Sequence, residues 1–279
     1  MNTPTNGIQA RSSIENNRAR ALVRFNSLLF HALATASFLE ASAPRHASHL
    51  AAAVARDQDA ATWVDSVWRP EREARGRELG EYIEAIWPEF DWPGAYEDFC
   101  NAYGQRAAQG AGLRSPRLGI LERCAVESQA AAFYRAIANC ADDPALRGLA
   151  AAAARDHVRC FEFFGSRFAS REGSGRIGFI AAGRVVVETS RAARDIDVAA
   201  AFFSLGAHWY GAPTVSQLGY QEFISRMAQL VSRHAGLGRM GWLLFHPWLR
   251  PAEPVAPIAG RGSRETVRPL PWPILKAAA

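Results

Sequence analysis

Apolar and polar residues follow the period of amphipathic helices along most of the chain. Strand signals are almost absent, because the β-branched run 184–188 lies inside a longer helical pattern. The pattern therefore predicts an all-α protein. The expected helices span approximately residues 18–41, 45–56, 59–87, 94–108, 116–140, 144–169, 176–192, 194–209, 216–235 and 237–246.

Turn and capping residues separate these helices. Asp142 or Asp143 is expected to cap the helix that begins with Pro144, since acidic side chains cap helices well and proline suits the first turn. Four long helices, 18–41, 59–87, 116–140 and 144–169, are expected to form an antiparallel bundle. The predicted organisation is a mobile arm at 1–17, a helical bundle at 18–169, additional helices at 170–249 and a Pro-rich tail at 250–279.

Composition indicates an ordinary globular protein, with 279 residues, 49% hydrophobic and 21% charged. The net charge is +5, and Lys276 is the only lysine. Arginines alternate with acidic residues instead of clustering, so we expect no nucleic-acid partner.

The N-terminal apolar stretch carries Arg24, Asn26 and His31, which makes it a poor membrane-spanning helix. Its polar lead-in is too long and too mixed in charge for a signal peptide. The four cysteines are spread singly, without the pattern of a secreted disulfide framework. We therefore expect a cytoplasmic protein without a transmembrane segment.

Three segments resemble the metal-binding helices of the ferritin-like superfamily. "WRPEREARGREL" resembles the stretch of acyl-carrier-protein desaturases that reads Trp, two spacers, then Glu-Glu-x-Arg-His-Gly. "RDHVRCFEFF" resembles the Asp-Glu-x-Arg-His stretch with its aromatic run, and "LERCAVESQAAAFYRAI" resembles the third ligand helix. The resemblance extends over about residues 20 to 165. Further helices after it are similar to those of small bacterial ferritin-like domain proteins.

The resemblance implies a ferritin-like four-helix bundle with additional C-terminal helices. In that family two helices each supply a glutamate and two supply Glu-x-x-His. The six di-metal ligand positions fall on Glu40, Arg72, Arg75, Glu127, His157 and Cys160. Only Glu40 and Glu127 keep a family ligand, so the resemblance implies a degenerate di-metal site.

Two buried glutamates without metal ions would be costly unless other cations compensated them. Arg72 and Arg75 offer two positive charges, and guanidinium groups grip carboxylates well. We therefore expect an ion-pair network in the core, no cofactor and a pseudoenzyme that binds a ligand or a partner. A solvent-facing position for both arginines is the plainer alternative.

A second alternative is an active non-haem metal-dependent oxidoreductase of the oxygenase or desaturase type. Cys124 and Glu127 share one helical face, and His157 and Cys160 share another. Two thiolates, one carboxylate and one imidazole are a suitable ligand set for a single iron or zinc ion. Buried cysteines that act as small apolar residues are the plainer interpretation.

The candidate partners are an apolar or acyl-type small molecule and a protein. The family's bundle encloses an apolar channel, which Phe133, Tyr134, Phe161 and Phe164 would line here. The same aromatic residues also fit an ordinary helical core. Asp195 and Asp197 are expected in the first turn of a helix.

Overall fold

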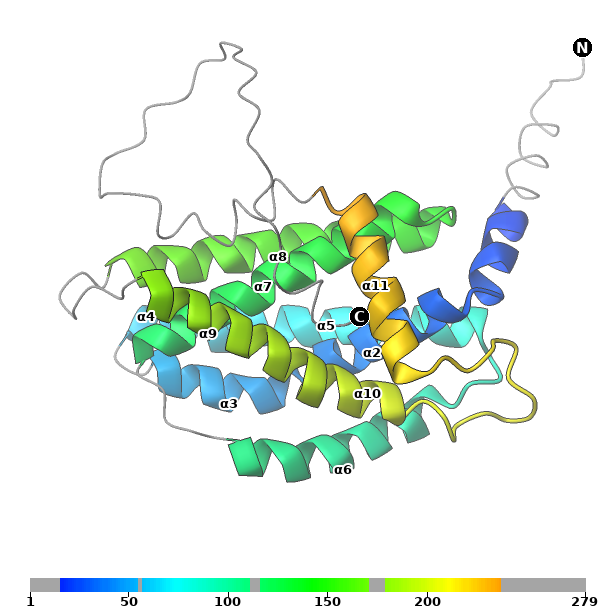
Figure 1. The fold of residues 1–279 in the computed structure, drawn as a ribbon, viewed down its shortest axis with the longest axis horizontal. Helices are drawn as coiled ribbons and strands as arrows, with labels where there is room; N and C mark the ends of the chain where they lie inside the picture. The colour runs from blue at the N-terminus through cyan, green and yellow to red at the C-terminus, as the bar shows by residue number, and fades with distance from the viewer. Residues whose placement is uncertain (1–15, 55–56, 111–115, 171–178, 237–279) are drawn as a thin grey trace, which may run out of the picture. The chain divides into compact units, whose positions relative to one another are not determined.

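The computed structural model describes residues 16–54, 57–110, 116–170 and 179–236 (Figure 1). These residues are mostly helical and contain no strand, which confirms the all-α class. Three expected segments lie outside the described ranges: residues 1–15 of the arm, the helix 237–246 and the tail 250–279.

The expected helix 18–41 is two helices, Asn16–Arg24 and α2 (Ser27–Ala41), which are bent by 83°. Asn26 causes the break, because its side-chain oxygen accepts a hydrogen bond from the backbone N–H of Leu29 at 3.1 Å. Asparagine is a preferred capping residue and competes with helix continuation. No single helix in the described ranges is long and apolar enough to cross a membrane, and this bent pair passes that test only when counted together.

The expected helix 59–87 is a path of three segments: α4 (Gln58–Trp63), the π-helical η1 (Val64–Trp68) and α5 (Arg69–Ile86). Asp57 caps its start, and its carboxylate accepts from the N–H of Ala60 at 3.0 Å. Pro70 follows η1 and cannot donate a backbone hydrogen bond, so the regular α-helical ladder is interrupted there.

Helix α3 (Ala43–Val54) precedes α4, and α6 (Trp92–Gly110) follows α5. The two longest helices are α7 (Pro116–Cys140) and α8 (Pro144–Ser170). Asp143 caps α8, and its carboxylate accepts from the N–H of Ala145 at 3.3 Å.

The C-terminal part differs more from expectation. Helix α9 (Phe179–Ala192) continues through the π-helical η2 (Ala193–Val198) into α10 (Ala199–Phe203). Asp195 and Asp197 therefore lie inside a continuous helical path, so their predicted position in a first turn is wrong. The chain leaves the helix after Phe203, and residues 204–219 form a loop before α11 (Tyr220–His234).

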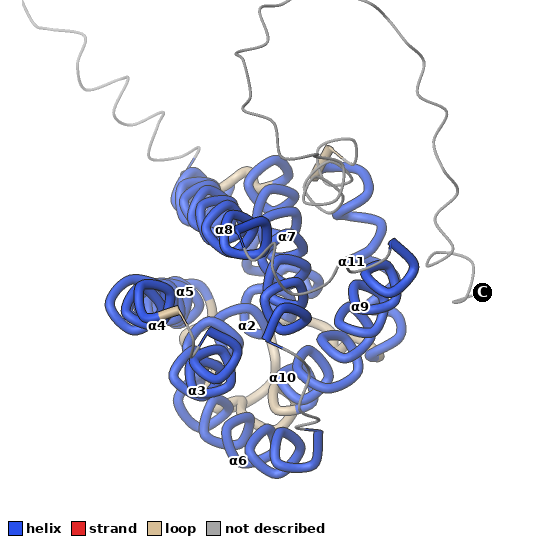
Figure 2. Tube along the Cα trace, turned by 90° about the vertical axis from the view of Figure 1, so that its left-hand side faces the viewer, coloured by secondary structure: helices blue, strands red, loops and turns tan. Residues whose placement is uncertain are grey.

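Four helices bring the charged core residues together. Helix α2 packs along α5, and α7 packs along α8, with α9 and α11 also against α7 (Figure 2). Gly76 permits the close approach of α5 to α2, since a Cβ there would lie 2.5 Å from the backbone nitrogen of Ala41. Helix α2 is buried on nearly all sides, as expected for a central helix.

Candidate functional site: a buried ion-pair cluster

One charged side chain from each of the four packed helices enters the same buried place. Glu40 comes from α2, Arg72 from α5, Glu127 from α7 and His157 from α8. Glu127 is fully buried, and Glu40 and His157 are 3% and 2% exposed. We name these four residues the ion-pair cluster.

Arg72 lies between the two carboxylates. Its Nε is 2.8 Å from Oε2 of Glu40, and its Nη1 is 3.8 Å from Oε2 of Glu127. The Nε–H does not point at the Glu40 oxygen, so this contact is an ion pair rather than a straight hydrogen bond. The guanidinium also lies 5.5 Å from the ring centre of Trp68, within cation–π range. Gly76, one turn further along α5, allows this approach.

His157 bridges the same two carboxylates from the other side. Its Nδ1 is 2.6 Å from Oε2 of Glu127, and its Nε2 is 3.0 Å from Oε1 of Glu40. Burial and the nearby Arg72 both act to lower the pKa of His157, but Glu40 and Glu127 outweigh them and raise it. Ionised carboxylates can only accept, so both ring nitrogens donate, as they do in imidazolium.

Arg72 and His157 are also in direct contact. Nη1 of Arg72 lies 2.9 and 3.0 Å from the two ring nitrogens of His157. An atom this close to both ring nitrogens would overlap Cε1 if it lay in the ring plane, so the guanidinium nitrogen sits over the ring face. That position leaves both imidazole N–H groups free for the carboxylates. Two cations are thus stacked between two anions.

Glu127 has partners on both oxygens. Its Oε1 accepts from the indole Nε1 of Trp68 at 3.0 Å and from Nε of Arg123 at 2.8 Å. Burial alone would raise the pKa of Glu127, but Arg123, His157 and Arg72 hold it well below its usual value. Glu127 is therefore an ionised carboxylate that is fully surrounded by donors.

Glu40 is held in a similar way. Its Oε1 also accepts from the hydroxyl of Tyr134 at 2.9 Å. Burial acts to raise the pKa of Glu40, and Arg72 and His157 overcome it and lower the value. The Tyr134 ring stacks on His157 with centres 5.3 Å apart, while burial and Glu40 raise the pKa of its hydroxyl well above normal. Tyr134 thus stays a neutral donor.

Arg75 does not pair with Glu40 or Glu127, contrary to expectation. It pairs with Asp156 and, at 2.9 Å, with Glu78. Three residues after Arg72, it lies on a neighbouring side of α5 and meets the residue that precedes His157 on α8. Arg159 and Glu71 form a further pair between the same helices. These outer pairs are more exposed than the cluster, so they contribute less to stability.

The alternative ligand set of Cys124, Glu127, His157 and Cys160 is only partly assembled. Glu127 and His157 are hydrogen-bonded to each other, and Cys160 borders the cluster. Cys124 belongs to the neighbouring apolar core. Burial raises the pKa of Cys124 to about 12 and also raises that of Cys160, so both are neutral thiols in the metal-free protein.

The donor set does not fit a metal ion. The carboxylate oxygens of Glu40 and Glu127 already contact cations or N–H and O–H donors, and Arg72 and Arg123 would repel a divalent cation. Within residues 16–236, apart from the gaps named above, no group of three or more His, Cys, Asp or Glu side chains is placed to hold one.

The cluster also leaves almost no room for a ligand. The cavity beside it has a volume of about 10 Å³. That space holds one water molecule at most. Tyr134 is committed to Glu40, and Phe161 and Phe164 are buried in the apolar core. An acyl chain therefore does not fit beside the cluster as it stands.

Three contacts of the site were not predicted from the sequence: the Trp68 indole as a donor, Arg123 as a partner of Glu127, and the hydroxyl of Tyr134, a residue expected to line a channel, as a donor to Glu40. Arg123 lies four residues before Glu127 on α7, a spacing that places the two side chains together. That spacing was the available signal. The Trp68 and Tyr134 contacts cross between helices and leave no such local signal.

The chain was compared with protein-family models, with curated proteins and with solved structures. None of the three comparisons finds a match. The functional proposal therefore rests on the geometry of the cluster.

Proposed function

We propose that this chain is a ferritin-like protein in which an ion-pair cluster occupies the position of the di-metal centre. Its role is then to bind a ligand or a partner, without oxygen chemistry at that position. The observation that carries the proposal is the convergence of Glu40, Arg72, Glu127 and His157 from four different helices.

The pairing of helices supports this proposal. In ferritin-like carboxylate proteins, each of the four bundle helices supplies inward-facing ligands to one shared site. Here α2, α5, α7 and α8 each supply at least one inward charged residue, and α7 supplies both Glu127 and Arg123. The motif resemblance assigns family ligand positions to the same four residues, so sequence and geometry point to one location.

The charges of the cluster support loss of the metal ions. Buried carboxylates need compensation, which two divalent cations provide in the family. Arg72, Arg123 and the His157 imidazolium provide it here. Each of these cations contacts at least one of the two glutamates. A protein with this arrangement keeps the bundle while giving up the family's chemistry.

Metal analysis of the purified chain tests the proposal. The protein is incubated separately with Fe(II), Mn(II) and Zn(II), desalted and analysed by inductively coupled plasma mass spectrometry. We expect far less than one equivalent of each metal per chain. Two equivalents of iron or manganese would overturn the proposal, and one equivalent of iron or zinc lost in Cys160→Ala would favour the oxidoreductase alternative.

A reconstruction tests the ancestry of the cluster. Arg72→Glu, Arg75→His, His157→Glu and Cys160→His together restore the family's ligand pattern, and Arg123→Leu removes the cation that pairs with Glu127. We expect this variant to bind two metal ions per chain. The matched control adds Glu127→Ala, which removes one ligand and should abolish paired binding. A folded reconstruction that binds no metal would contradict the ferritin-like assignment.

A further inference from the structure

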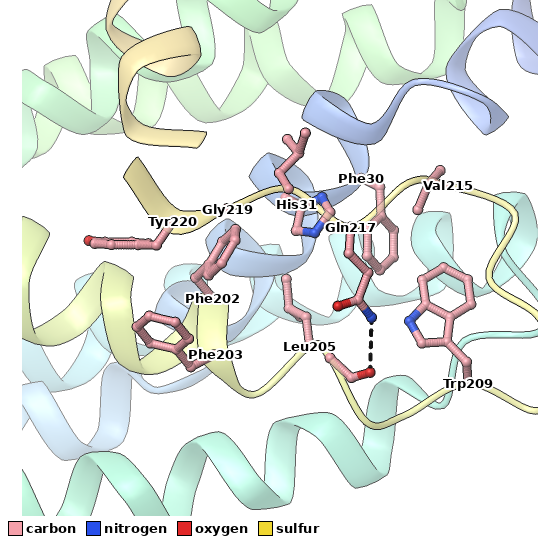
Figure 3. A pocket seen from close by; sticks show the side chains of 12 residues that line it. Phe30, His31, Phe202, Phe203, Leu205, Trp209, Val215, Gln217, Gly219 and Tyr220 are labelled. Atoms are coloured by element: carbon pink, nitrogen blue, oxygen red, sulfur yellow. Dashed lines mark hydrogen bonds between the residues drawn. The ribbon is translucent and has the colours of Figure 1, made fainter. Parts of the chain in front are cut away.

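A second cavity lies at the other end of α2, between that helix, α10 and the loop 204–219 (Figure 3). Its volume is about 210 Å³. Aromatic rings, among them Phe30, Phe202, Trp209 and Tyr220, form about half of its wall. We name it the aromatic cavity.

The aromatic cavity is distinct from the ion-pair cluster. His31 lines the cavity, and Glu40 of the cluster lies nine residues further along the same helix. At a rise of 1.5 Å per residue, that separation is about 14 Å. A ligand in the cavity would therefore not touch the cluster, and the inference below goes beyond the proposed function.

His31 is the polar feature of the cavity wall. It is 5% exposed, and its ring stacks on Phe202 with centres 5.2 Å apart. Its Nδ1 lies 2.7 Å from the backbone oxygen of Ser27, which can only accept, so Nδ1 carries a proton. Burial lowers the pKa of His31 more than this hydrogen bond raises it, so the ring is neutral.

Nε2 of His31 is consequently a hydrogen-bond acceptor. Among residues 16–236 as far as they are described, no protein donor is paired with it. Gln217, whose side chain crosses the same cavity, instead donates to the backbone oxygen of Gly206 at 3.2 Å (Figure 3). Nε2 is therefore open to the cavity, where a ligand's O–H or N–H group can donate to it in place of water.

The cavity wall is held in place by the connection between α5 and α6. Trp209 packs its ring against Phe30 and Phe90, with centres 4.9 and 5.3 Å apart. The N–H of Tyr210 donates to the oxygen of Glu89 at 2.8 Å. The loop that closes the cavity is therefore anchored at several points, and the cavity is pre-formed, which favours binding.

The lining contains no Asp, Glu, Lys or Arg, and His31, its titratable side chain, is neutral. An anionic ligand would find no cation, and a cationic one no carboxylate. An apolar cavity of about 150 Å³ is already large enough for benzene. The available volume thus suits one aromatic ring with a small substituent, and the aromatic walls favour such a ring.

We propose that the aromatic cavity binds a neutral single-ring aromatic molecule whose hydroxyl or N–H group donates to Nε2 of His31. Phenols and anilines are the simplest members of this class. Phe30, Phe202 and Trp209 contact the ring, and His31 orients it. Phe203, another lining residue, is largely exposed to solvent.

Fluorine NMR titration of the full chain tests the proposal. The probes are 4-fluorophenol, 4-fluorotoluene, which has no donor, and 4-fluorobenzoate, which is charged. We expect 4-fluorophenol to bind roughly tenfold more tightly than 4-fluorotoluene, as one hydrogen bond would give, and 4-fluorobenzoate not to bind. In His31→Phe, the affinity for 4-fluorophenol should fall to that for 4-fluorotoluene.

Gly206→Leu tests the location of the site independently of His31. A Cβ at Gly206 meets only the Gln217 side chain, at 3.9 Å, so the larger side chain can fill the cavity without disturbing the backbone. We expect binding of both neutral probes to be lost. Gly148→Leu is the matched control, because a Cβ there has no atoms within 4 Å, and it should bind normally.

Equal affinity for 4-fluorophenol and 4-fluorotoluene would overturn the role of His31. Unchanged binding in Gly206→Leu would overturn the site itself. If His31→Phe does not fold, the imidazole nitrogen spectrum of the native chain replaces it: 4-fluorophenol must shift the Nε2 signal of His31, and an unmoved signal contradicts the proposal. None of these readouts depends on metal content, so the two proposals can fail separately.

Discussion

Two buried histidines, His157 in the ion-pair cluster and His31 in the aromatic cavity, show opposite behaviour in one molecule. Their exposures are 2% and 5%, so burial does not separate them. His157 contacts two carboxylates, which raise its pKa and keep it charged. His31 has one backbone partner and aromatic neighbours, so burial lowers its pKa and keeps it neutral.

The surroundings of the two histidines also decide how much space is left. Around His157 the charges attract one another and close the site to about 10 Å³. Around His31 the rings are rigid and have no such attraction, and about 210 Å³ remains. The polar site therefore fills itself, whereas the aromatic site can accept a ligand. We therefore expect a small-molecule ligand in the uncharged aromatic cavity and not beside the ion-pair cluster.

The largest expected effect comes from removing one anion of the cluster. Glu127→Gln keeps the shape but leaves Arg72, Arg123 and His157 with one carboxylate. Breaking a buried charge network in this way typically costs about 3–5 kcal/mol of unfolding free energy. Urea denaturation followed by circular dichroism measures it.

The matched control for this experiment is Glu71→Gln, which breaks the outer pair with Arg159. Both of those side chains are substantially exposed, so the loss should be at most about 1 kcal/mol. Similar losses for the two variants would show that the cluster is no more than a surface ion pair.

The next effect comes from the helix contact that brings Arg72 to Glu40. In Gly76→Ala the new Cβ would overlap the backbone of Ala41, and overpacking of this kind costs typically 1–3 kcal/mol. Gly148→Ala is the control, since its Cβ has open space and alanine favours a helix by roughly 0.5–1 kcal/mol. The two substitutions should therefore shift the melting temperature in opposite directions. A stabilising Gly76→Ala would contradict the close approach.

The sequence predicted the helices better than their interruptions. Periodicity indicates helix over long windows, so α7 and α8 appear close to where they were expected. It does not reveal the cap at Asn26 or the widened turn before Pro70, because each depends on a single residue within an otherwise regular pattern.

The candidate site was predicted in part for a similar reason. The position of Arg72 beside Glu40 and Glu127 could be predicted, because the resemblance to the family's second ligand helix indicates which face of α5 points inward. Arg75 lies three residues after Arg72, so its side chain points to a different side of α5. The sequence does not show that Asp156 on α8 stands on that side and pairs with it. The aromatic cavity was missed entirely, because the loop 204–219 approaches α2 from far along the chain.

A smaller effect is expected on the alkaline side of the pH profile. The folded-state pKa of His157 is raised above its unfolded value near 6.5, so its stabilising contribution is complete below that pH and is lost as the pH rises through the raised value. The slope is at most about 1.4 kcal/mol per pH unit. Chemical denaturation at a series of pH values should show this decline in the native chain and not in His157→Gln. An identical slope in both would mean that the imidazole is not charged in the folded protein.

The smallest effect should have the opposite sign and belong to His31. Its folded-state pKa lies below the unfolded value, so the unfolded chain binds the proton more tightly and stability is lost as the pH falls from about 6.5 through the lowered value. Carboxylates such as Glu40 also lose stabilising charge in acid, so the informative quantity is the difference between the native chain and His31→Phe at each pH. That difference should shift in favour of the variant as the pH falls, because phenylalanine keeps the ring but cannot take up a proton. A difference that stays constant from pH 7 to pH 5 would mean that His31 is not held neutral. It would also remove the physical reason for expecting a hydrogen-bond donor, rather than an anion, in the aromatic cavity.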